Sequence, residues 1–137
     1  MMNSYDEYGL FAENNPEYGL EVSATPLVKR VRVGMADGRN LSALVWGDTD
    51  PRLVLVHGGA QNAHTWDTVA LALGVPLVAL DLAGHGQSDW REDGLYNHDN
   101  LAADVTTAIE LLAPNANAVV GMSLGGLTAL AVAQRSP

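Results

Sequence analysis

Alternation between apolar and polar residues predicts two strands near the beginning of the chain. Residues 27–33 and 41–46 alternate over short spans, as half-buried strands do. The sequence Ala-Asp-Gly-Arg-Asn at 36–40 lies between them and has the composition of a tight turn. We therefore expect a β-hairpin here.

Further along, short apolar runs alternate with segments of helical spacing. Residues 53–56, 76–80 and 118–120 are continuous apolar runs, typical of strands buried on both faces. Helical spacing predicts helices over 64–73, from an N-cap at Asn100 onward, and over 127–134. The side chains expected to face inward are Trp66, Val69, Ala70 and Leu73 in the first helix, and Leu101, Val105, Ala108, Ile109 and Leu112 in the second.

Strands that alternate with helices predict an α/β fold, with a mainly parallel sheet flanked by helices. We expect this domain to occupy residues 26–137. Residues 1–25 differ, since they hold five acidic residues and no basic one, and repeat Glu-Tyr-Gly-Leu at 7–10 and 17–20. We predict an acidic, flexible leader, with a short binding repeat as the alternative.

Composition and charge exclude several classes of function. The net charge is −9 with only seven Lys and Arg residues, whereas nucleic-acid binding needs clustered basic residues. No cysteine is present, which excludes disulfides and thiolate chemistry. No apolar run approaches the roughly 20 residues that span a bilayer, and the N-terminus lacks the pattern of a secretory signal. We expect a cytoplasmic protein without a membrane span.

The most informative motif is Gly-x-Ser-x-Gly, formed by Gly121, Ser123 and Gly125. It follows a predicted strand and precedes a predicted helix, the context of a nucleophile elbow. Such a turn strains the backbone of the serine, and side chains at the two glycines would collide across it. Ser123 is therefore a candidate nucleophile, and the alternative is a structural turn serine.

Two further motifs follow the other apolar runs. His57-Gly58-Gly59 comes after 53–56, and a loop at 81–89 containing Asp81, Gly84, His85 and Gly86 comes after 76–80. Carboxyl ends of parallel strands converge on one crevice, so all three motifs should meet there. We expect the N–H groups of Gly59, or alternatively Ala60, and of Leu124 to bind an oxyanion that develops during attack.

Cofactor and metal sites are not predicted. Gly84-His85-Gly86 begins like a dinucleotide-binding motif, but Asp89 replaces its third glycine and would repel an anion. Residues 121–126 lack the Lys-Ser/Thr of a phosphate-binding loop. No His or carboxylate pair has a spacing suited to metal ligands.

Together, His-Gly, Asp-x-x-Gly-His-Gly-x-Ser-Asp and Gly-x-Ser-x-Gly-Gly, which ends at Gly126, resemble the N-terminal half of the α/β-hydrolase fold. The motifs resemble those of the lipases, esterases and C–C-bond hydrolases of this fold, and the resemblance covers about residues 27–137. It implies an eight-stranded sheet of which this chain holds about five strands. It also implies that the triad acid and histidine follow the serine in sequence.

On this resemblance, Ser123 would attack an ester, thioester, lactone or activated ketone carbon of a small-molecule substrate. No Asp, Glu or His follows Ser123. The resemblance implies that His57 and His85 are turn residues, with His57 bracing its turn, since the family's base comes later in the chain. Asp81 and Asp89 are expected to fix the 81–89 loop, with a displaced triad acid as the alternative.

Three hypotheses follow. The first is a serine hydrolase present as a truncated chain that is inactive alone. The second is a non-catalytic half-domain that acts as a binding or assembly module. Its open sheet edge would make the isolated chain oligomeric or prone to aggregate. The third is a complete miniature hydrolase that uses His85 or His57 together with Asp81.

Overall fold

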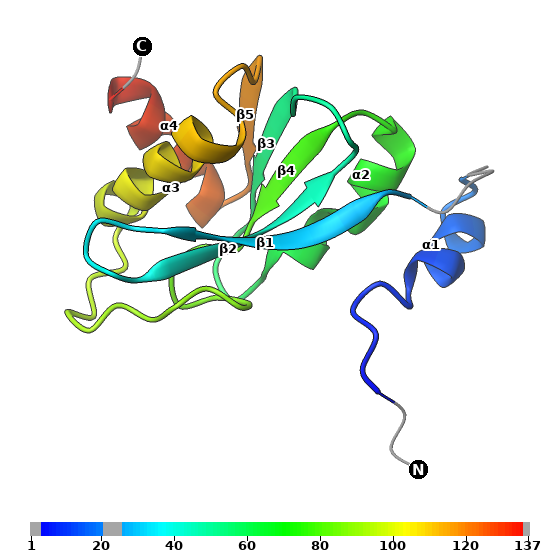
Figure 1. Ribbon diagram of the computed structural model, residues 1–137, viewed down its shortest axis with the longest axis horizontal. Coiled ribbons are helices and arrows are strands. Elements are labelled where there is room, and N and C mark those ends of the chain that lie inside the picture. The colour runs from blue at the N-terminus through cyan, green and yellow to red at the C-terminus, as the bar shows by residue number, and fades with distance from the viewer. Residues whose placement is uncertain (1–3, 21–25, 136–137) are drawn as a thin grey trace.

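A computed structural model describes residues 4–20 and 26–135. The elements in chain order are α1 (Phe11–Glu17), β1 (Val28–Gly34), β2 (Asn40–Trp46), β3 (Leu53–Val56), the 3-10 helix η1 (Ala63–Trp66), α2 (Asp67–Leu73), β4 (Leu77–Leu80), α3 (His98–Leu112), β5 (Ala118–Gly121) and α4 (Leu124–Arg135) (Figure 1).

The five strands form one sheet in the order β1-β2-β4-β3-β5. The predicted hairpin is present, since β1 and β2 pair antiparallel from Val28↔Trp46 to Gly34↔Asn40. β2 is also antiparallel to β4, whereas β3 is parallel to both β4 and β5. The α/β class and the flanking helices are confirmed. The sheet is mixed because the hairpin joins the three-stranded parallel part through β2, the one strand of the five that runs in the opposite direction.

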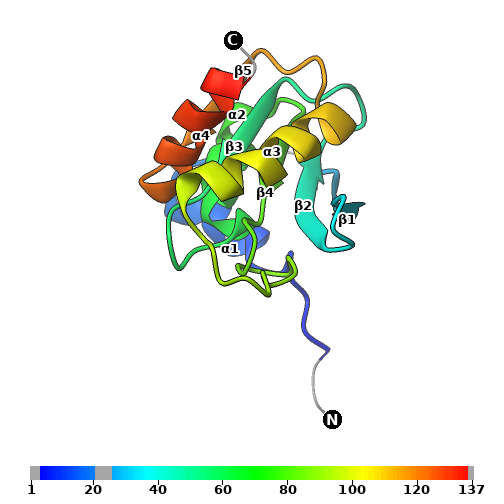
Figure 2. The same ribbon diagram turned by 90° about the vertical axis from the view of Figure 1, so that its left-hand side faces the viewer.

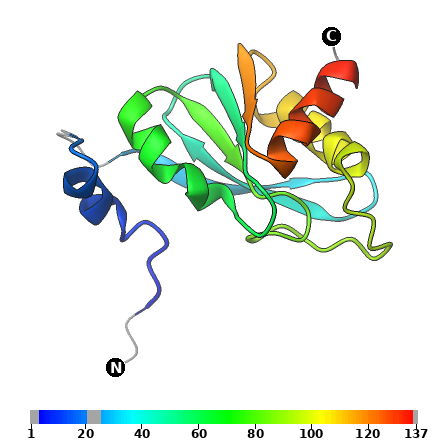
Figure 3. The same cartoon turned by 180° about the vertical axis from the view of Figure 1, so that it is seen from behind.

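Two apolar clusters cover opposite faces of the sheet, because side chains alternate along each strand. In β3, Val54 and Val56 belong to the cluster under α3 and α4, whereas Leu55 belongs to the cluster that includes α2 and Phe11 of α1. The helices α3 and α4 pack together on their face (Figure 2). On the other face α1 lies next to α2 (Figure 3).

The helices begin earlier than predicted. α3 starts at His98, and its N-cap is Asn97, whose Oδ1 accepts a hydrogen bond from the N–H of Asn100 at 3.0 Å. The expectation of an N-cap at Asn100 was therefore wrong by one turn. α4 starts at Leu124, directly after the serine.

The inward face of α3 is confirmed, and that of the preceding helix is partly wrong. Leu101, Val105 and Ala108 are buried, with Ile109 and Leu112 packed at the edge of the core. The predicted helix 64–73 is a 3-10 turn followed by α2. This change of winding rotates the second part, so that Ala70 and Leu71 are buried while Val69 and Leu73 are 39% and 47% exposed.

The first described residues lie against the domain. Phe11 is buried, and its ring lies 5.0 Å from that of Trp46. Glu7, in the first Glu-Tyr-Gly-Leu copy, forms an ion pair with Arg30, whereas Glu17 and Tyr18 of the second copy are exposed. The flexible leader and the division at residue 25 stay predictions, and residues 21–25 lie outside the described part. Within the described ranges, the helices are too short or too polar to cross a membrane.

Candidate active site

Ser123 occupies a sharp turn between β5 and α4. Its φ of +52° lies in the left-handed region, which strains any residue other than glycine. Only Met122 and Ser123 separate the last residue of β5 from the first of α4. The serine is exposed and stands at the N-terminus of the helix, where backbone N–H groups point outward.

The two motif glycines allow this turn because neither position has room for a Cβ atom. A Cβ on Gly121 would lie 2.2 Å from the carbonyl oxygen of Gly125. A Cβ on Gly125 would lie 2.2 Å from the carbonyl oxygen of Val56, at the end of β3. Gly126 is less crowded, with 3.3 Å between its would-be Cβ and the oxygen of Gly121. Bare backbone contact therefore fixes α4 against β5 and β3.

The turn after β3 lies against the serine. A Cβ on Gly58 would lie 3.5 Å from Cβ of Ser123, and the N–H of Gln61 donates to the Gly58 carbonyl at 3.3 Å to close the turn. Ala60, in this turn, has a φ of +60°.

Two backbone N–H groups are open beside Ser123. A Cβ on Gly59 would be 3.9 Å from a methyl carbon of Leu124, so the two residues are neighbours. Leu124 opens α4, and the first N–H groups of a helix have no partner within it. Within the described part of the chain, the Gly59 N–H donates no hydrogen bond. This geometry suits the predicted oxyanion donors.

His57 is fully buried, and both ring nitrogens are engaged. The N–H of Leu82 donates to His57 Nε2 at 3.0 Å, so the ring proton is on Nδ1, which donates to the Gly58 carbonyl at 2.6 Å. Burial lowers the pKa of His57, which keeps the ring neutral. The side chain ties the turn after β3 to the loop after β4 and has no free lone pair with which to deprotonate Ser123.

Asp81, directly after β4, is also fully buried. Its carboxylate accepts hydrogen bonds from the N–H of Ala63 at 2.7 Å, from Arg30 Nη1 at 2.8 Å and from the N–H of Gln87 at 3.0 Å. A Cβ on Gly86, whose φ is +51°, would lie 2.3 Å from this carboxylate. Asp81 thus holds its own loop and the start of η1.

The remaining loop residues also make structural contacts. Gly84 has a φ of +75°, and a Cβ there would meet the ring of Tyr96 at 2.7 Å. His85 Nδ1 lies 2.9 Å from the Ala83 carbonyl, and its ring centroid lies 5.0 Å from that of His57. The N–H of Asn40 donates to Asp89 at 2.7 Å, and this bond lowers the pKa of Asp89.

A charged cluster that the sequence analysis missed joins the N-terminal segment to this network. Arg30 donates to Glu7 through Nε at 2.8 Å as well as to Asp81. His64 Nδ1 lies 2.7 Å from Asp67, and Nε2 lies 3.2 Å from Glu7. The hydrogen bond with Asp67 raises the pKa of His64. The spacing of His64 and Asp67, three residues apart in a predicted helix, could have revealed their pairing.

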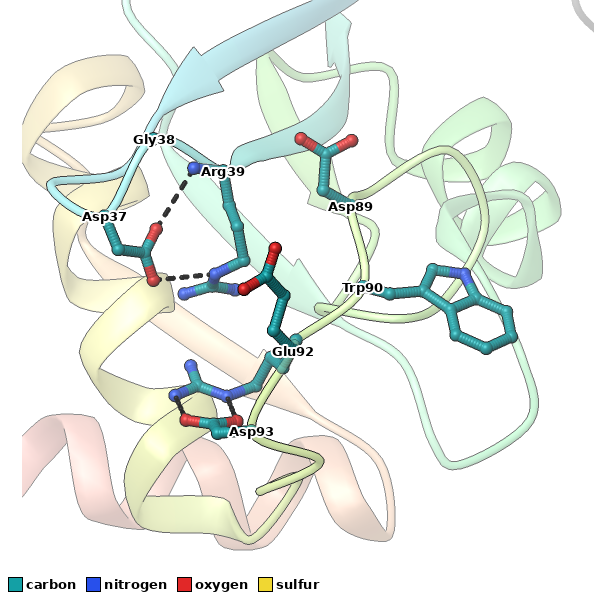
Figure 4. A pocket seen from close by; sticks show the side chains of 8 residues that line it. Asp37, Gly38, Arg39, Asp89, Trp90, Glu92 and Asp93 are labelled. Carbon is teal, nitrogen blue, oxygen red and sulfur yellow. Dashed lines mark hydrogen bonds and ion pairs between the residues drawn. The ribbon is translucent and has the colours of Figure 1, made fainter.

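A pocket of about 500 Å³ lies between the β1–β2 turn and the loop after Asp89 (Figure 4). Its arginines are paired, Arg39 with Asp37 and Asp104, and Arg91 with Asp93. The bonds from Arg91 lower the pKa of Asp93 to about 2. In the described part of the chain, no group of three or more His, Asp or Glu side chains could hold a metal ion.

Comparison with known proteins identifies the family. A family model described as alpha/beta hydrolase fold matches residues 51–137. The esterase Rv0045c of Mycobacterium tuberculosis is 47% identical over 136 residues, which are 99% of this chain and 44% of the relative. A pimeloyl-[acyl-carrier protein] methyl ester esterase of Sodalis glossinidius is 37% identical over 100 residues, which cover 69% of this chain and 37% of the relative.

Solved structures agree with this assignment. A crystal structure of esterase Rv0045c matches with a TM-score of 0.90 at 47% identity, over 100% of this chain and 47% of the other. A thioesterase domain from the curacin biosynthetic pathway matches with a TM-score of 0.71 at 26% identity, over 81% of this chain and 41% of the other. The chain spans less than half the length of these relatives. It belongs to the α/β hydrolase fold family.

Proposed function

We propose that this chain carries the nucleophile of a serine hydrolase that cleaves small-molecule carboxylic esters. The observation that carries the proposal is the strained left-handed backbone of Ser123, held between β5 and α4 by two positions without room for a Cβ. Strain of this kind persists where the surroundings enforce it, often at reactive residues. The names of the two esterase relatives favour an ester, and a thioester, a lactone or an activated C–C bond are alternatives.

In the proposed reaction, Ser123 Oγ attacks the carbonyl carbon and its proton passes to a general base. The negative charge that develops on the carbonyl oxygen is bound by the N–H groups of Gly59 and Leu124, each worth about 3 kcal/mol in the transition state. The C–O bond to the alcohol then breaks, and the alcohol leaves with the proton from the base. A water molecule then gives a proton to the base and attacks the acyl carbon. The C–O bond to Ser123 breaks, the acid is released, and the serine oxygen takes the proton back from the base.

We assign the general base of this mechanism to a segment outside residues 1–137, because the chain spans less than half the length of its esterase relatives. His57 has no free lone pair, and residues 124–137 contain no Asp, Glu or His. Asp81 is committed to three donors, which argues against a miniature triad built on it. We expect Ser123 in the 137-residue chain to react slowly unless a base is supplied.

The test supplies the base as free imidazole. We expect 4-nitrophenyl acetate to acylate Ser123, with a rate that rises with imidazole concentration and a site identified by peptide mass spectrometry. Ser123→Ala should reduce the rate to that of imidazole in bulk solution, whereas Ser4→Ala, at an exposed serine, should leave it unchanged. Equal imidazole-dependent rates in wild type and Ser123→Ala would contradict the proposal.

A second candidate function, a binding or assembly module, rests on the edge formed by β5. Among the described residues this strand pairs with β3 alone. Val120, within the strand, is 41% exposed, and Leu127 and Leu130 of α4 are 53% and 66% exposed. Residues 111–134 contain no charged side chain. Unprotected edges of this kind pair readily with other strands.

Sedimentation equilibrium tests this second function. We expect the isolated chain to self-associate, and Val120→Lys to weaken the association by placing a charge on the edge. Val69→Lys on α2, where the valine is 39% exposed, is the matched control and should not alter it. A wild-type chain that stays monomeric and unfolds cooperatively would exclude assembly through β5.

A further inference from the structure

We propose that Gln61 is a positioning residue for the oxyanion donors. Its side-chain carbonyl holds the turn of residues 58–61, here named the oxyanion turn, in the conformation that leaves the Gly59 N–H open. The inference rests on the proposed function, because it concerns the same site. It adds a residue that lies outside every motif identified in the sequence.

The carboxamide of Gln61 closes the oxyanion turn a second time. The N–H of Gly58 donates to Gln61 Oε1 at 3.0 Å, and the N–H of Gln61 donates back to the Gly58 carbonyl at 3.3 Å. His57 Nδ1 donates to the same carbonyl at 2.6 Å. The Gly58 carbonyl shares a peptide plane with the Gly59 N–H, so its two bonds fix that plane, and the bond to Gln61 Oε1 fixes the preceding His57–Gly58 peptide.

The side chain supplies an acceptor that the buried backbone would otherwise lack. Gly58 is buried, whereas Gln61 is exposed. In the described part of the chain, Gln61 Oε1 is the acceptor found for the Gly58 N–H. A buried donor without a partner is costly, so loss of Oε1 favours rotation of the His57–Gly58 peptide, which carries this N–H, toward water or another acceptor. The left-handed φ of +60° at Ala60 makes the turn easier to distort, because strain there must be balanced by contacts.

The oxyanion turn lies so close to the nucleophile that small movements of it change the geometry of the site. A Cβ on Gly58 would lie 3.4 Å from the Met122 carbonyl and 3.5 Å from Cβ of Ser123. Oxyanion stabilisation depends on donors about 3 Å from the developing charge. Rotation of the His57–Gly58 peptide would turn Gly58 and tilt the next peptide, so that the Gly59 N–H is displaced while the serine stays in place.

The test compares two substitutions that keep the length of the side chain. Gln61→Met removes the acceptor oxygen, and Gln61→Glu retains one. Gln134→Met, at an exposed position of α4, is the matched control. Hydrogen exchange of the Gly58 amide, followed by NMR on the 137-residue chain, reports the bond directly. We expect about tenfold faster exchange in Gln61→Met, as for loss of one hydrogen bond, and wild-type exchange in Gln61→Glu and in the control.

The second measurement is the imidazole-dependent acylation of Ser123. Gln61→Met should lower its maximal rate about tenfold, without raising the ester concentration at half-maximal rate. This is less than the roughly hundredfold to thousandfold loss expected when an oxyanion donor is removed outright, because here the donor is only displaced. If the exchange rate of the Gly58 amide is unchanged in Gln61→Met, the hydrogen bond to Gln61 Oε1 does not hold the turn and the proposal is wrong. Faster exchange with an unchanged acylation rate would reduce Gln61 to a structural role. If wild-type Ser123 does not react at all, the proposed function fails, and so does any role of Gln61 in it, while the exchange data still decide whether Gln61 holds the turn.

Discussion

The turn that carries Ser123 and the loop after β4 both lie at the end of the sheet where the parallel strands finish, but different interactions hold them. The turn is fixed by backbone packed on backbone, through Gly121 and Gly125, within a stretch that has no charged residue. The 81–89 loop is fixed by ionised and polar side chains centred on Asp81, which receives three hydrogen bonds.

This contrast predicts different sensitivities. Close backbone packing has no titratable part, so the Ser123 turn should be indifferent to pH and salt but intolerant of any added atom. A buried carboxylate network tolerates changes of shape better, but loses much of its stability when one charge is removed. Substitutions in each region can test whether this division holds.

The largest effect is expected for Gly125→Ala. The new methyl group would lie 2.2 Å from the Val56 carbonyl and 2.5 Å from that of His57, so α4 must leave β3. We expect a loss of unfolding free energy above about 4 kcal/mol, a range reached by few single substitutions. Urea denaturation checks this, with Gly34→Ala as control because a Cβ there meets nothing within 4 Å. Similar stability of both variants would show that the turn adapts.

Asp81→Asn should rank second. The amide NH₂ would face a donor on either side of the former carboxylate, and Arg30 would lose one of its two carboxylate partners. Breaking a buried ion pair costs about 3–5 kcal/mol. The measurement is again urea denaturation, together with NMR of the Ala63 and Gln87 amides. A loss below about 1 kcal/mol, the scale of exposed pairs, would remove Asp81 as the centre of the loop.

Glu7→Gln should have a smaller effect on the same network. The carboxylate of Glu7 is 17% exposed and binds Arg30 and His64, so we expect a loss of about 1 kcal/mol. Glu17→Gln is the matched control, since Glu17 is exposed at the end of α1. Equal thermal unfolding of the two variants would mean that the N-terminal segment contributes nothing through its charge.

The smallest effect is the pH dependence that His64 contributes. Asp67 and Glu7 lie on its two nitrogens, with Arg30 Nη2 at 3.4 Å from Nε2. The raised pKa of His64 means that its stabilisation is fully present below pH 6.5 and is lost as pH rises through the folded-state pKa. We expect the unfolding free energy to fall by roughly 0.5 kcal/mol over this pH range, and we expect no such fall in His64→Gln. If the unfolding free energies of wild type and variant change in parallel from pH 6 to 8, His64 makes no such contribution.

Much of the fold followed from the sequence because its signals are local. A few neighbouring residues are enough to predict the strands at 53–56 and 118–120, and the same holds for the turn whose glycines flank Ser123. The start of α3 was missed because Asn97 and Asn100 are equally good caps, and only the geometry shows that Asn97 accepts from Asn100.

The contacts around the candidate site were less predictable, because they join distant parts of the chain. Arg30 lies on β1, and no local pattern links it to Asp81, 51 residues away. The hydrogen bond from the N–H of Leu82 to His57 Nε2 could not be predicted either, because every residue except proline has a backbone N–H and the sequence does not show which one is used. The interaction of Gln61 with Gly58 spans only three residues, but glutamine occurs too widely to mark a turn.

Gly121 and Gly125 also have a genetic consequence. Every other amino acid has a Cβ atom, so every missense change at these two codons places a carbon where carbonyl oxygens already lie 2.2 Å away. No conservative replacement exists at either codon. In a deep mutational scan that selects for folding, every substitution at Gly121 and at Gly125 should therefore be deleterious. Small residues should be tolerated at Ser123 in that scan, and should be lost there only when the selection is for catalytic activity.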